Sequence, residues 1–165
     1  MFEEILGLPL HPLAIHFPIV LVPSLVAASL AYALVPRFRR YVMWLAALLA
    51  VVAPGAAYVA KLSGEALRDE RVIPSGASEG IIAGINDHAN LGNRLLWASL
   101  GLGVVTLLLI GVRRYGGDST AKTWVAWGLT GLVVVAAALA AISIFLVGDS
   151  GAEMVWKEKW QVPSS

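Results

Sequence analysis

The side chains with the widest chemical range in this sequence are its three histidines, His11, His16 and His88. An imidazole ring can ligate haem iron, zinc or copper through one of its nitrogens. His16 and His88 belong to two separate apolar segments and fall at the same predicted end of them. Because side chains on facing helices form cofactor sites in helical bundles, we predict that His16 and His88 are the axial ligands of a non-covalent b-type haem.

The spacing of His11 and His16 bears on which of them reaches the interior. Five residues along an α-helix turn the chain by about 500°, so the two rings cannot share a helix face. Only one of them can point into a bundle with His88, and His11 is the substitute ligand if His16 faces lipid. Gly92 lies on the same face as His88, four residues later, and leaves room for a macrocycle. Arg94 is a candidate partner for a haem propionate, with extension to the membrane surface as the alternative.

Two other interpretations of these residues are open. His16, His88 and Glu65 together would form a mixed nitrogen and oxygen ligand set that suits zinc or copper. Alternatively, no cofactor is bound, and the histidines make structural hydrogen bonds near the membrane surface. The protein would then be a structural accessory subunit of a larger membrane complex, in which small residues such as Ser99 and Gly103 allow close helix packing.

Composition excludes several kinds of chemistry. The sequence contains no cysteine, which rules out disulfides, thiolate nucleophiles, cysteine-bound iron–sulfur clusters and covalent c-type haem. It also lacks a phosphate-binding loop and the G-x-S-x-G and H-E-x-x-H motifs. A net charge of +1 gives no general attraction to nucleic acid. We therefore expect an electron carrier or an accessory subunit rather than an enzyme, and no nucleic-acid partner.

The elements that must hold these residues are apolar helices. Hydrophobic residues make up 58% of the 165 residues and charged residues only 14%, compared with about 25% in an average soluble domain. A helix needs roughly 20 apolar residues to cross a bilayer core, and four segments meet that length. We predict one domain, an all-α integral membrane four-helix bundle, with helices at about 12–36, 41–62, 84–113 and 123–147. A polar outer loop (63–83) and a polar C-terminal tail (148–165) complete it.

The distribution of basic residues predicts the orientation in the membrane. Four helices put both termini and the long loop on one side. No Lys or Arg precedes the first helix, whereas Arg37, Arg39 and Arg40 follow it closely. Because basic residues favour the cytoplasmic side, we predict a multi-pass protein of the bacterial cytoplasmic (inner) membrane. Both termini and the three histidines would then lie on the outer side.

The segment HPLAIHFPIVL, residues 11–21, resembles the opening HPL-x-VHFP motif of a family of small bacterial membrane proteins catalogued as domain of unknown function 2231. Ile15 stands where that motif has valine, and His88 fits a histidine that opens the third helix in the family. The segment GDSGAEMVW resembles the closing motif, although the terminal histidine of that motif is absent here. The resemblance implies four helices and a bacterial origin. Relatives fused to or encoded beside cytochrome-like proteins imply a redox role.

The function predicted from these observations is that of a membrane electron-transfer subunit with haem b near the outer (periplasmic) face. Its mechanism would be the relay of single electrons, with no substrate bond made or broken. The expected partners are membrane lipid and either other membrane subunits or a periplasmic cytochrome.

Overall fold

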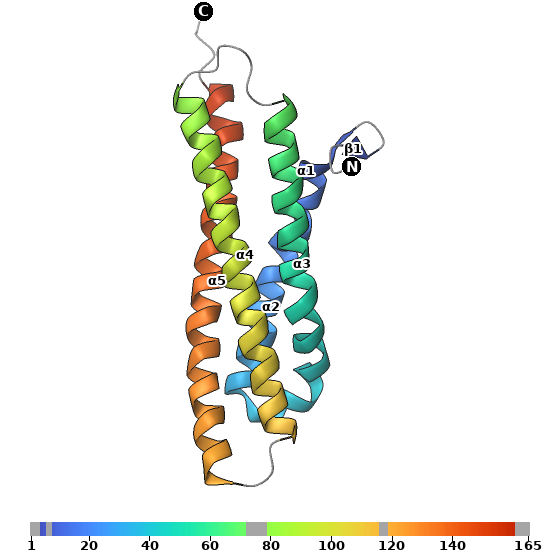
Figure 1. Ribbon diagram of the computed structural model, residues 1–165, viewed down its shortest axis with the longest axis vertical. Helices are drawn as coiled ribbons and strands as arrows, with labels where there is room; N and C mark the ends of the chain where they lie inside the picture. The colour runs from blue at the N-terminus through green and yellow to red at the C-terminus, as the bar shows by residue number, and fades with distance from the viewer. Residues whose placement is uncertain (1–3, 6–7, 72–78, 116–118, 161–165) are drawn as a thin grey trace, which may run out of the picture.

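The architecture is a bundle of four long helices that lie side by side (Figure 1). The computed structural model describes residues 4–5, 8–71, 79–115 and 119–160. The long helices are α2 (His16–Leu34), α3 (Arg39–Arg71), α4 (Glu79–Tyr115) and α5 (Thr120–Trp160). The short elements are strands β1 (Glu4–Ile5) and β2 (Leu8–Pro9), which pair antiparallel, helix α1 (Leu10–Ala14) and the 3-10 helix η1 (Pro36–Phe38).

Each long helix contains a segment long and apolar enough to cross a membrane. These candidate spans are His11–Leu34, Pro36–Ala66, Ile82–Tyr115 and Thr120–Met154. Large apolar side chains also cover the outside of the bundle: Phe17 is 64% exposed, Trp44 72% and Phe145 71%. A soluble monomer rarely exposes so much contiguous apolar surface. The predicted all-α four-helix membrane bundle is therefore confirmed.

The first predicted helix is broken into α1 and α2, because a proline interrupts its hydrogen bonds. Pro18 has no backbone N–H, so the carbonyl of Ala14 cannot receive the usual bond from the residue four positions later. Helix α1 ends at Ala14, and α2 begins at His16. Backbone bonds from Ile15 to His11 (3.1 Å) and from Ile19 to Ile15 (3.3 Å) bridge the break. Helix α1 packs against α3, which sets the direction of His11.

Two segments that were expected to be polar loop or tail are helical. Helix α3 continues to Arg71, α4 begins at Glu79, and α5 continues to Trp160. The prediction is thus wrong for 63–71, 79–83 and 148–160, while 72–78 and 161–165 lie outside the described residues. On α3, the charged residues in the last turns of the span do not end the helix, since Lys61 and Glu65 form an ion pair of 2.6 Å at the favourable i, i+4 spacing.

The interior of the bundle is packed through small residues and one buried polar contact. A Cβ atom at Gly103 would overlap the backbone carbonyl of Ala50, so α4 and α3 touch backbone to backbone there. The Thr106 hydroxyl donates a hydrogen bond of 2.9 Å to the Ser29 hydroxyl, and both side chains are fully buried. Such contacts hold helices together in lipid. Burying apolar side chains between helices stabilises a bundle little there, because the lipid tails are equally apolar.

Candidate functional site

The structure brings two of the three histidines together, His11 of α1 and His88 of α4. Their ring centroids lie 6.5 Å apart and the ring planes are nearly perpendicular, at 87°. We call these two residues the histidine pair. His16 is exposed on the outside of the bundle, so the partner of His88 is His11 and not His16. The physical reason is helical periodicity: the backbone stays helical through Ile15, and five residues turn a helix by about 500°, so the packing of α1 against α3 that turns His11 inward leaves His16 outside.

The ring of His11 is held by one turn of α3. Its Nδ1 lies 3.1 Å from the carbonyl oxygen of Ala60 and 3.2 Å from the Ser63 hydroxyl oxygen. The Ser63 hydroxyl already donates to Ala60 at 2.9 Å. Because a carbonyl oxygen can only accept, Nδ1 must carry the proton and donate, which leaves Nε2 with a free lone pair in the neutral ring. A Cβ at Gly64 would lie 3.0 Å from His11 Cε1, so the glycine makes space for the ring.

The ring of His88 is held in the same manner by α5. Its Nδ1 lies 2.8 Å from the hydroxyl oxygen of Ser150. That hydroxyl also lies 3.0 Å from the carbonyl oxygen of Val147. It has one hydrogen for two acceptors, so the contact holds the ring of His88 at Nδ1 and leaves both tautomers open. A Cβ at Gly151 would lie 3.3 Å from His88 Cε1.

Each histidine thus rests on a Ser-Gly dipeptide, which the sequence analysis did not single out. The dipeptides are Ser63-Gly64 on α3 and Ser150-Gly151 on α5. The serine hydroxyl lies against Nδ1 of the ring, and the glycine allows the ring to approach the helix. The signal in the sequence is that SGEA and SGAE occur once each, at the outer ends of the second and fourth predicted helices. Both dipeptides lay in segments expected to be loop and tail, which concealed their role.

The other predicted site residues lie away from the histidine pair or contribute only space. Glu65 is paired with Lys61 on its own helix, and Arg94 is exposed. No group of three His, Cys, Asp or Glu side chains able to hold a metal ion occurs in the described ranges. The predicted zinc or copper set of His16, His88 and Glu65 is therefore not assembled, because one member faces outward and another has a different partner.

Open space flanks His88 along α4. Gly84 and Gly92 lie four residues before and after His88, hence on the same side of the helix. A Cβ at either glycine would meet nothing within 4 Å. The role predicted for Gly92, to leave room beside His88, is compatible with this geometry.

The histidine pair has the chemical requirements of two ligands to one metal centre. Nε2 of His11 offers a lone pair in the neutral ring, and the Nδ1 of each ring lies against a protein oxygen, as the second nitrogen of a metal-ligating histidine almost always does. Two imidazoles on opposite sides of one metal, with metal–nitrogen bonds of about 2 Å, have centroids roughly 6 Å apart. The observed separation of 6.5 Å is close to that value.

Comparison with known proteins gives one family. The family described as "Predicted membrane protein (DUF2231)" matches residues 7–163 of the chain. No curated protein and no solved structure matches the chain. The matched range contains the whole histidine pair and both Ser-Gly dipeptides. The comparisons therefore agree with the membrane fold and add no activity.

Proposed function

The chain belongs to the DUF2231 family of membrane proteins, and we propose that it is an electron-transfer subunit whose histidine pair holds a non-covalent b-type haem. One observation carries the proposal: His11 and His88 come from separate helices, their ring centroids lie 6.5 Å apart, and the Nδ1 of each ring lies against a protein oxygen, which leaves Nε2 as the candidate ligand atom. A haem bound there would supply one-electron transfer. The contacts to Nδ1 of His11 and His88 would fix the orientation of the two ligand rings.

The surroundings of the histidine pair support a planar group more than a closed metal-ion site. A structural zinc site closes with four protein ligands, whereas only two nitrogen ligands converge here. The open positions beside Gly84 and Gly92 add space along α4 on the side of His88. Arg94 is exposed and makes no contact with the pair, so a haem propionate would find its partner elsewhere or in water.

The depth of the histidine pair suits exchange of electrons with a partner outside the membrane. His88 and Arg113 are about 25 residues apart on α4, which at 1.5 Å per residue gives roughly 38 Å. The hydrocarbon core of a bilayer is only about 30 Å thick. If Arg113 marks one membrane surface, the pair lies at the opposite one, which the positive-inside rule assigns to the periplasm. A periplasmic cytochrome or another membrane subunit would then be within reach.

A second candidate is a structural accessory subunit without cofactor, and the same hydrogen bonds favour it. His11 ties α1 to α3, and His88 ties α4 to α5, so both rings have partners without any ligand. Satisfied polar contacts of this kind stabilise a bundle near a membrane surface by themselves. The two candidates differ at Nε2 of each ring: this nitrogen binds iron in the haem proposal and has no ligand in the accessory-subunit proposal.

An absorption spectrum of the purified protein, produced with haem supply intact, tests the proposal. We expect a Soret band and a reduced-minus-oxidised difference in the α-band region. His11→Ala and His88→Ala should abolish both signals, whereas His16→Ala, the matched control, should keep them. Absence of the band in the unmutated protein, or equal loss in all three variants, would refute haem binding at the histidine pair. Elemental analysis of the same sample reports zinc or copper.

A further inference from the structure

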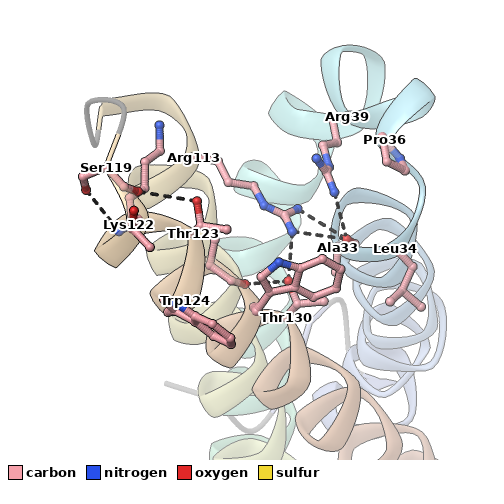
Figure 2. Close-up of a pocket in the computed structure, with 13 residues that line it drawn as sticks. Ala33, Leu34, Pro36, Arg39, Arg113, Ser119, Lys122, Thr123, Trp124 and Thr130 are labelled. Carbon is pink, nitrogen blue, oxygen red and sulfur yellow. Dashed lines mark hydrogen bonds between the residues drawn. The ribbon is translucent and has the colours of Figure 1, made fainter.

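The opposite end of the bundle contains a basic cavity. Its volume is about 820 Å³, and it lies where α2 ends, α3 begins, α4 ends and α5 begins (Figure 2). Three cationic side chains line it, Arg39, Arg113 and Lys122, and none of its described lining residues is acidic. We propose that this cavity, here called the arginine cavity, binds the phosphate headgroup of an anionic phospholipid.

The two arginines converge on the end of α2. Arg113 donates to the carbonyl oxygens of Tyr32 (3.1 Å) and Ala33 (3.3 Å), and Arg39 donates to the same two oxygens at 3.1 and 3.3 Å. A further bond of 2.9 Å joins Arg113 to the hydroxyl of Thr130. Figure 2 shows the two guanidinium groups approaching Ala33 from different helices. Because they share acceptors, their charges are held close together.

The end of α2 offsets only part of this charge. A helix C-terminus carries about half a negative elementary charge, whereas Arg39 and Arg113 bring two full positive charges and Lys122 a third. Within the described ranges none of the three makes an ion pair. Capping of α2 therefore explains why the arginines are ordered, but it leaves an excess of positive charge around an open cavity. A phosphate group would offset that excess, since guanidinium groups match phosphate oxygens in geometry and charge.

The N-terminus of α5 lies at the other wall of the arginine cavity. Helix α5 begins at Thr120, and the hydroxyl and carbonyl oxygens of Ser119 accept the backbone N–H groups of Lys122 and Thr123 at 3.2 and 3.3 Å. The N-terminus of a helix favours anions through its partial positive charge. Both walls of the cavity therefore favour the same kind of ligand.

Tryptophans at the rim indicate that the anion comes from lipid. Trp124 and Trp127 line the arginine cavity and are 74% and 69% exposed. Indole rings concentrate at the level of lipid headgroups, so these two residues place the cavity at that level. Basic pockets between spanning helices at the cytoplasmic surface bind anionic headgroups, and the orientation predicted from the basic residues puts this end in the cytoplasm.

Native mass spectrometry of the purified protein in neutral detergent tests the assignment. The probes are phosphatidylglycerol, phosphatidylcholine and inorganic phosphate, added separately and in competition. We expect phosphatidylglycerol to bind more tightly than phosphatidylcholine, and Lys122→Gln to weaken its binding by about fivefold, the worth of one basic residue near the membrane surface. Arg113→Gln should weaken it at least as much. Lys122→Gln keeps the experiment interpretable if loss of Arg113 disturbs the end of α2.

Arg114→Gln is the matched control, because Arg114 is the exposed neighbour of Arg113 and does not line the arginine cavity. It removes the same charge from the same end of the bundle and should leave phosphatidylglycerol binding unchanged. Equal affinity for the two lipids, or equal weakening by Arg114→Gln and Lys122→Gln, overturns the proposal. Full displacement of phosphatidylglycerol by millimolar inorganic phosphate would identify a soluble anion as the occupant and overturn the lipid assignment.

Discussion

Ser63 and Ser150 occupy equivalent positions beside the two histidines. Each serine precedes a glycine, and its hydroxyl oxygen lies 3.2 Å from Nδ1 of His11 or 2.8 Å from Nδ1 of His88, respectively. Both hydroxyls also lie against a carbonyl oxygen of their own helix, three residues earlier. The two rings are therefore held at the same nitrogen atom by the same kind of side chain. The residues that hold the two imidazoles can each be tested by substitution.

The hydrogen bond between His88 and Ser150 is the first such test. Ser150→Ala removes the hydroxyl that holds Nδ1 of His88 at 2.8 Å, so the ring loses its fixed orientation. Loss of a partner of this kind typically costs about 10–100-fold in affinity for the bound group. We expect haem titration of the variant to show a weakening in that range, with Ser143→Ala on the same helix as control. Unchanged affinity would contradict the role assigned to Ser150.

The glycine beside His11 provides a second test. Gly64→Val puts a branched side chain where even a Cβ would be 3.0 Å from His11 Cε1, so the ring must move away from Ser63. We expect the haem spectrum to be lost and the unfolding free energy to fall by about 1–3 kcal/mol, as for other overpacked sites. Gly55→Val is the control, because a Cβ there meets nothing within 4 Å. If both variants retain the spectrum equally, Gly64 does not position the ring.

Close packing of α3 and α4 gives a prediction that is independent of any cofactor. Gly103→Val should separate the two helices, because a Cβ at Gly103 would overlap the backbone carbonyl of Ala50 and that backbone cannot rotate away. We expect a destabilisation of about 3 kcal/mol or more, above the range for flexible core positions. Gly101→Val, two residues earlier at an open position, should cost much less. Thermal unfolding in detergent, compared side by side, measures the difference.

The predicted orientation can be checked by single-cysteine labelling, since the sequence contains no cysteine. Asp149→Cys lies next to Ser150, which contacts His88 of the histidine pair, and Thr120→Cys lies at the start of α5. With an impermeant maleimide on intact cells, we expect the residue at position 149 to react directly and the residue at position 120 to react only after permeabilisation. The reverse pattern would place the histidine pair in the cytoplasm and remove a periplasmic cytochrome as partner.

Much of the fold follows from sequence because hydropathy is a local property. Four apolar segments of sufficient length require four spanning helices. Successive spans alternate in direction, so the starts of the first and third helices, where the histidines lie, are at the same end of the bundle. The lengths of α3, α4 and α5 were underestimated for a related reason. Charged residues near the end of an apolar segment do not end a helix when neighbours such as Lys61 and Glu65 pair along it.

The sequence by itself determined the membrane bundle and the end at which its histidines lie. Only the tertiary structure decided that His11, not His16, meets His88, because that choice depends on the packing of α1 against α3. It also decided that Ser63 and Ser150 hold the two rings and that Arg39 and Arg113 converge on one helix end. Each of these contacts joins residues from different helices, and helical periodicity within one segment carries no information about its neighbours.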